Sequence, residues 1–177
     1  MIDEAEVWDR FAALLPDADA GEVRTCWEVG EQEAGVEYLV DALLRHRVPI
    51  GEDTRAELSV VAEAWGVREA VAGRLGQCPG DGRPAALELV ERPDTLPLDG
   101  PGLIDPALAD CVLIPWIRST GSGRLLVRAY VEEPWGDLSY LPEYYGVLAS
   151  AQGPSSALFE SFAARAALEE LVRPSHP

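Results

Sequence analysis

The apolar positions between residues 27 and 65 recur at helical spacing and predict a helical hairpin. The stripe of its first helix consists of Val36, Leu39, Val40, Leu43 and Leu44. Residues 48–51 (VPIG) then place a proline and a glycine in a turn. Thr54, with Glu57 three residues later, has the spacing of a capping box for the second helix. Gly66 stands where a left-handed residue would end that helix.

Two more helices complete the expected N-terminal unit. Residues 3–15 begin with Asp3 as a candidate N-cap, carry acids in their first turn and end before Pro16. The loop DADAGE follows at residues 17–22. Residues 67–75 repeat an apolar stripe and predict a short helix. Residues 1–76 therefore predict a subdomain of about four helices.

The pattern changes after residue 76. The turn-rich stretch QCPGDGRPA is the best candidate for a linker, and residues 86–91 alternate like an exposed strand. Residues 111–118 and 124–131 are the two best strands, and the loop STGSG between them predicts a β-hairpin over 111–131. Pro115 lies inside the first of these strands, which implies an edge position or a bulge.

Aromatic and apolar residues dominate the rest of the chain. Residues 135–145 are rich in aromatic side chains, and a short helix is expected to begin near Pro142. A last helix is expected over 156–172, while residues 92–106 predict an ordered but irregular connection. The predicted fold class is α+β: a helical subdomain at 1–76, followed at 77–177 by a small antiparallel hairpin unit with C-terminal helices.

Charge narrows the choice of partner. The chain has 31 acids against 14 bases, all of them arginine, for a net charge of −17. Such a charge argues against binding to nucleic acid or to an anionic membrane, because both require cations on the protein. It favours a basic protein partner attracted by long-range steering, with simple solubility as the alternative explanation. The acidic N-terminus lacks a secretory signal, and no apolar run reaches the about 20 residues of a membrane helix, so we expect a cytoplasmic protein.

No catalytic or metal-binding motif stands out. The three cysteines are widely spaced, as expected for reduced thiols, and lie at Cys26, Cys78 and Cys111. His46 and His176 are the only histidines; His46 is expected to complement a helix C-terminus. Ser119 and Ser122 outline a zinc knuckle with serine in place of cysteine, but serine does not replace thiolate as a zinc ligand. We therefore expect a plain loop at 119–123, no metal, no cofactor and no catalytic residue.

A helical projection of residues 27–45 separates two faces. Glu33 falls on the inward stripe, where a carboxylate must be paired or hydrogen-bonded; a catalytic or partner-binding role is the alternative. The opposite face is a line containing Trp27, Glu31, Ala34, Tyr38, Asp41 and Arg45. Two rings and two acids on one surface have the composition of a binding patch for a cationic partner. A further helix of the bundle covering this face is the competing explanation.

Six residues are therefore candidate partner-binding residues: Trp27, Glu31, Tyr38, Asp41, Trp135 and Tyr140. The last two belong to the aromatic segment 135–145, whose rings could also pack in the core of the C-terminal subdomain. An enzyme or small-molecule binder with an aromatic pocket at 135–145 is the main functional alternative. A scaffold protein with a metal-free, zinc-ribbon-like hairpin is the second.

Residues 27–57 resemble the immunity proteins of bacterial polymorphic toxin systems, especially the Maf-type and contact-dependent-inhibition immunity proteins. The resemblance rests on the Glu31-Gln32-Glu33 run, on the helix VEYLVDALL and on the turn VPIGEDT. Proteins of this kind are small, acidic, helix-rich and cytosolic, and they neutralise a cognate toxin, often a basic nuclease, by covering its active site. The resemblance implies a non-enzymatic inhibitor with a basic toxin domain as its partner.

Overall fold

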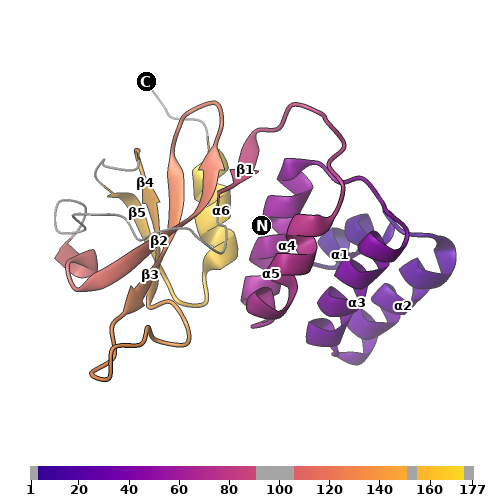
Figure 1. The fold of residues 1–177 in the computed structure, drawn as a ribbon, viewed down its shortest axis with the longest axis horizontal. Coiled ribbons are helices and arrows are strands. Elements are labelled where there is room, and N and C mark those ends of the chain that lie inside the picture. Colours follow the sequence, from indigo (N-terminus) through magenta and orange to yellow (C-terminus); the bar gives the residue numbers. More distant parts are fainter. Residues whose placement is uncertain (1–3, 91–105, 151–154, 174–177) are drawn as a thin grey trace. The chain divides into compact units, whose positions relative to one another are not determined.

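The computed structural model describes residues 4–90, 106–150 and 155–173 (Figure 1). The chain divides into two compact units, Met1–Pro84 and Ala85–Pro177, and each is described by itself. The fold class is α+β, as the sequence predicts: helices form the first unit, and an antiparallel sheet with one C-terminal α-helix forms the second. The expected boundary at residue 76 precedes the observed division. The irregular connection expected at 92–106 lies almost wholly outside the described residues.

The helical unit contains α1 (Glu4–Ala12), α2 (Asp17–Val29), α3 (Gln32–Arg45), α4 (Glu52–Ala64) and α5 (Arg68–Gln77). The helix not predicted as a separate element is α2, which includes the expected loop DADAGE. Pro16 at its N-cap and the acids Asp17 and Asp19 in its first turn favour a helix start there. Gly30, with a φ of 84°, ends α2 and separates it from α3. The single helix expected through residue 30 is therefore two helices.

The turn between α3 and α4 follows the prediction only in part. α4 begins at Glu52 with Gly51 at the N-cap, so Thr54 lies inside the first turn and the predicted capping box is wrong. Gly66 has the expected left-handed conformation, with a φ of 70°. The predicted inward stripes are mostly confirmed, because Trp8, Val40 and Leu58 are all buried in one core.

The second unit is built on a five-stranded antiparallel sheet in the order β1-β2-β3-β4-β5. Its strands are β1 (Leu87–Leu89), β2 (Cys111–Ser119), β3 (Leu125–Val131), β4 (Tyr144–Leu148) and β5 (Ser155–Glu160); a short 3-10 helix, η2 (Pro106–Leu108), precedes β2. The hairpin expected over 111–131 is confirmed as β2 and β3. A bulge between Pro115 and Ile117 lets an interior strand contain a proline.

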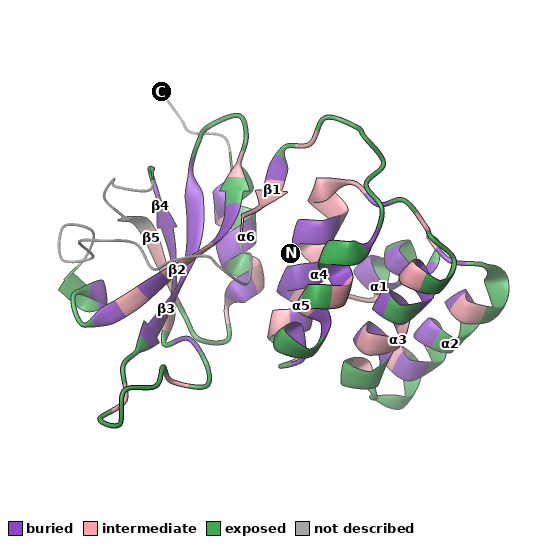
Figure 2. Ribbon diagram, viewed as in Figure 1, coloured by how far each residue is buried: buried purple, intermediate pink, exposed green. Residues whose placement is uncertain are grey.

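Two helix predictions in this unit are wrong. Residues near Pro142 lead into β4, and residues 155–160, where the last helix was expected to begin, form β5. The sequence YYGVL has the aromatic and branched residues that favour strands. The α-helix α6 (Ala164–Val172) begins only where apolar residues recur at helical spacing, and it contacts β3, β4 and β5. Figure 2 shows the strands largely buried, while the β3–β4 connection is mostly exposed.

Candidate protein-binding site

Residues 132–143 join β3 to β4 and are called the β3–β4 arm (Figure 1). Backbone hydrogen bonds hold the arm as an extension of the hairpin: Ser139 N–H donates to the Val131 carbonyl at 2.8 Å, and Glu133 N–H donates to that of Asp137 at 2.8 Å. Gly136, with a φ of 92°, forms the tight turn at its tip. The arm therefore extends the β3–β4 hairpin as a hydrogen-bonded, β-like segment.

The Ser139 hydroxyl fixes the base of the arm. Its oxygen accepts a hydrogen bond from the Val131 backbone N–H at 3.2 Å, and its hydroxyl donates to the Leu141 carbonyl at 2.9 Å. Together with the backbone bond from Ser139 to Val131, these contacts connect the two sides of the arm. A surface held in this way loses little conformational freedom when it binds.

Large apolar side chains project from the arm into solvent. Trp135 is 72% exposed and Tyr140 is 81% exposed, and both were predicted from the sequence as partner-binding residues. Leu138 and Leu141 are also exposed, although the sequence analysis did not single them out. Several exposed apolar side chains on one short arm are typical of a protein-binding surface, in which tryptophan and tyrosine dominate the binding energy. Trp135 and Tyr140 are therefore both exposed residues of the same arm.

The same arm carries only acidic charge. Glu132, Glu133, Asp137 and Glu143 are its ionisable residues apart from Tyr140, and it contains no arginine. In the described part of the chain, none of these four carboxylates forms an ion pair with an arginine. Unpaired carboxylates around exposed rings favour a partner that presents arginine or lysine beside an apolar surface.

The alternative in which aromatic residues 135–145 form a core holds for only part of the segment. Tyr145 is buried and its ring lies 5.8 Å from that of Trp116, and Tyr144 packs against the apolar cluster on the sheet. Trp135 and Tyr140 are far more exposed and enclose no core. Rings with this exposure also make poor walls for a small-molecule pocket.

The predicted line on the helical unit is largely engaged within the bundle. Trp27 belongs to α2, half-buried, with its ring 5.5 Å from that of Trp8. Tyr38 is half-buried in α3 and donates a hydrogen bond to Asp19 of α2. Glu31, Ala34, Asp41 and Arg45 are exposed, but Asp41 pairs with Arg74 of α5 and Arg45 pairs with Asp19 of α2. This geometry favours the competing explanation, in which a neighbouring helix covers the face.

Asp19 gathers a polar cluster between α2 and α3. It accepts hydrogen bonds from Tyr38 Oη at 2.6 Å and from Arg45 Nη2 at 2.5 Å, and it contacts His46 Nε2 at 2.8 Å. The Tyr38 hydrogen bond, followed by that to His46 and the charge of Arg45, lowers the pKa of Asp19. The same hydrogen bond raises the pKa of Tyr38. Because Asp19 bonds to all three side chains, the cluster fastens α2 to α3.

Glu33 does not lie where the helical projection placed it. Its side chain is exposed, and Val29, expected beside it on the inward stripe, is 63% exposed. The break at Gly30 restarts the helical phase, so a projection continued from α2 into α3 places these residues wrongly. Glu33 instead lines a shallow cleft of about 340 Å³ with Glu31 and Trp65. The expectation of a buried, paired carboxylate is wrong.

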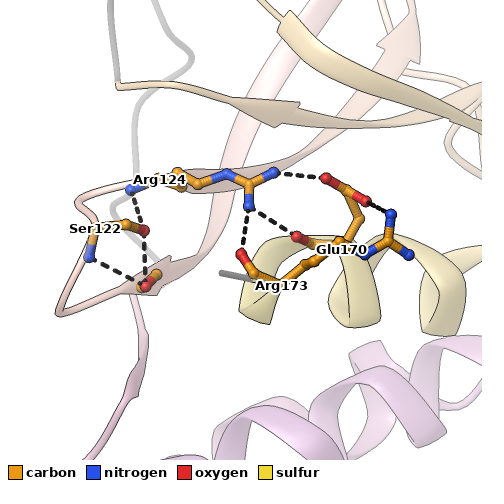
Figure 3. A network of polar contacts seen from close by, with 5 residues as sticks. Ser122, Arg124, Glu170 and Arg173 are labelled. Atoms are coloured by element: carbon orange, nitrogen blue, oxygen red, sulfur yellow. Dashed lines mark hydrogen bonds and ion pairs between the residues drawn. The ribbon is translucent and has the colours of Figure 1, made fainter. Parts of the chain in front are cut away.

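The loop at 119–123 is held by its own hydroxyls (Figure 3). Ser122 Oγ donates to Ser119 Oγ at 2.9 Å and accepts a hydrogen bond from the Arg124 backbone N–H at 3.3 Å. In the described residues no group of three or more histidine, cysteine or acidic side chains is placed to hold a metal ion. No helix among all the described residues is both long and apolar enough to span a membrane.

The cysteines also give no candidate nucleophile. All three are free and buried, and burial is the main cause that raises the pKa of each thiol. A raised pKa keeps a thiol protonated near neutral pH, and the thiolate is the reactive form. Burial therefore keeps all three thiols in their protonated, less reactive form.

No family model matches the chain, no curated protein matches its sequence, and no solved structure matches its fold.

Proposed function

We propose that this chain is an acidic, non-enzymatic inhibitor that binds a basic protein in the cytoplasm. The specific form that we propose is an immunity protein that neutralises a basic, nuclease-like bacterial toxin, in line with the sequence resemblance at residues 27–57. The observation that carries the proposal is the β3–β4 arm, which exposes Trp135 and Tyr140 among carboxylates that form no ion pair within the described parts of the chain. Rings supply buried area in a complex, and carboxylates supply attraction and pairing.

The distribution of arginine supports the same partner. Arg55, Arg68 and Arg124 are buried in the fold and pair with Glu52, Glu63 and Glu170. Exposed arginines such as Arg24 and Arg118 also form ion pairs within the chain. Because many cations are paired internally while acids remain in excess, the surface attracts basic proteins and repels polyanions.

The test is binding to the product of the neighbouring gene, which the proposal expects to be a basic toxin-like protein, with inhibition of its activity and rescue of growth as functional readouts. We expect association to slow by about tenfold or more between about 50 and 500 mM NaCl, because salt screens the attraction. Binding of an acidic or neutral protein instead, or binding with no salt dependence, would contradict the proposal. So would binding without inhibition.

A further inference from the structure

Phe162 is an exposed ring at the same end of the sheet as the arm. Tyr144 pairs with Glu160 at the end of β4 and β5, and the arm enters β4 directly before Tyr144. The turn after Glu160 is closed by a hydrogen bond from the Ala163 N–H to the Glu160 carbonyl at 2.9 Å, and Phe162 lies within that turn. Its side chain is 86% exposed. Figure 1 shows both connections leaving the same end of the sheet.

Exposed apolar side chains are concentrated at this end. We call the group the sheet-end surface; it consists of Val131, Trp135, Leu138, Tyr140, Leu141 and Phe162. In the described parts of the chain, every other exposed large apolar side chain is either Val29 or Val172. Scattered single apolar residues need no explanation, whereas a group at one end of a sheet indicates an interaction site.

The charge around this surface selects the occupant. Glu160 of β5 adds a fifth carboxylate to those of the arm, and the nearest bases along the chain are the buried Arg128 of β3 and the half-buried Arg165 of α6. Two copies meeting through this surface would bring like charges together, which is costly. A basic protein meets no such repulsion. The sheet-end surface therefore fits a cationic partner and disfavours self-association.

We infer that the sheet-end surface is a two-part interface, in which its rings enter an apolar groove on a basic protein while its carboxylates pair with arginine or lysine at the rim of that groove. The inference rests on the proposed function and specifies the interface and the partner's surface. The two parts act on different rates: carboxylates govern the salt-dependent association rate, and buried rings govern the dissociation rate.

Two sets of variants separate these parts against the same basic toxin-like protein. Trp135→Ala, Tyr140→Ala and Phe162→Ala, made singly, are each expected to raise the dissociation rate by about tenfold or more, because these residue types dominate interface energies. The triple variant Glu132→Gln, Glu133→Gln, Asp137→Asn is expected to slow association by about threefold to tenfold at about 50 mM NaCl and to approach wild type at about 500 mM.

Matched controls come from the helical unit. Glu6, Asp17 and Glu22 are exposed, and the triple variant Glu6→Gln, Asp17→Asn, Glu22→Gln removes the same charge outside the sheet-end surface and outside residues 27–57. Val29→Ala removes an exposed apolar side chain that does not belong to the sheet-end surface. Both controls should bind with rates within about twofold of wild type, apart from a small general charge effect. Thermal melting of every variant confirms that the fold is intact.

The outcomes distinguish the two proposals. If wild type binds but the ring variants dissociate at the wild-type rate, the sheet-end surface is not the interface, and the proposed function stands. If the arm and helical charge variants slow association equally, the carboxylates of the arm have no special role and the two-part interface is wrong. If wild type binds no basic protein, the proposed function fails, and this inference fails with it.

Discussion

A glycine in α3 shows how closely the helices of the first unit pack. A Cβ atom added to Gly35 would lie 2.8 Å from Trp8 Cζ3 and 2.9 Å from Cys26 Cβ. The groups that approach Gly35 belong to α1 and α2. The residue is thus required by the core of the bundle.

Gly35→Ala should destabilise the protein by about 1–3 kcal/mol, because overpacking outweighs the better helix propensity of alanine. Gly73 in α5 is the matched control, since an added Cβ there meets no atom within 4 Å. Gly73→Ala should stabilise by about 0.5–1 kcal/mol. Urea unfolding of both variants measures the difference. Equal effects of the two substitutions would contradict the packing argument.

The Asp19 cluster predicts a pH dependence at acidic pH. Its lowered pKa means that the folded state favours the carboxylate more than the unfolded chain does, so Asp19 stabilises the fold above its ordinary pKa of 3.8. This stabilisation is lost as the pH falls through the folded pKa. Asp19→Asn should therefore lower the melting temperature near neutral pH and reduce the loss of melting temperature on acidification.

Asp9→Asn is the control for that measurement, because Asp9 is exposed and forms a single ion pair with Arg24 at 2.7 Å. Surface pairs of this kind contribute little, so its melting temperature should follow wild type at each pH. Melting curves recorded between about pH 7 and pH 2.5 would test both variants. Identical acid dependence of wild type and Asp19→Asn would refute the role of the cluster.

At the scale of elements, buried arginines donate hydrogen bonds to the carbonyls at the C-termini of helices. Arg55 of α4 donates to the carbonyls of Leu75 and Cys78 at the C-terminus of α5. Arg124, next to β3, donates to the carbonyls of Glu170 and Arg173 at the C-terminus of α6, at 2.9 and 3.1 Å (Figure 3). The last carbonyls of a helix have no partner within it, and a fixed cation there also complements the helix dipole.

Arg124→Ala should destabilise the sheet unit by about 1–3 kcal/mol, because it leaves half-buried acceptors without their donor. The loss should be concentrated in α6, where amide hydrogen exchange should accelerate more than in β2 or β3. Arg118→Ala is the control: Arg118 forms an exposed pair with Glu88, which is worth at most about 1 kcal/mol. Unchanged exchange in α6 would show that Arg124 does not hold this helix end.

Elements whose apolar residues recur at regular spacing could be predicted from the sequence. Elements whose conformation depends on pairing with a strand distant in sequence could not. The α3–α4 pair and the β2–β3 hairpin follow from apolar spacing and turn residues. β4 and β5 were expected as helix because their residues suit both states, and pairing with β3 decides between them. The site divides similarly: Trp135 and Tyr140 were predicted, whereas Phe162 joins them only through sheet register.

At the scale of the whole molecule, many arginine side chains bond to other groups of the same chain. Arg128 is buried in the sheet unit, with its guanidinium 5.4 Å from the Trp116 ring and 5.5 Å from the Tyr130 ring, and it donates to Tyr130 Oη at 2.7 Å. Arginine suits such positions, because its planar group combines stacking with several directed hydrogen bonds. Internal use of arginine concentrates the excess negative charge on the surface, where it can steer a partner.

The two compact units predict that the helical unit folds alone. Its apolar cluster is drawn from residues 7–78, and the chain beyond α5 is fixed by hydrogen bonds from the Ile50 N–H to the Pro79 carbonyl and from the Asp81 N–H to the Ile50 carbonyl. A fragment of residues 1–84 should therefore show a helical circular dichroism spectrum and a cooperative melt. A fragment of residues 1–77 loses the buried Cys78 and an acceptor of Arg55, so it should melt several degrees lower. Equal melting of the two fragments would place the boundary at residue 76, and a non-cooperative melt of both would show that the helical unit depends on the sheet unit.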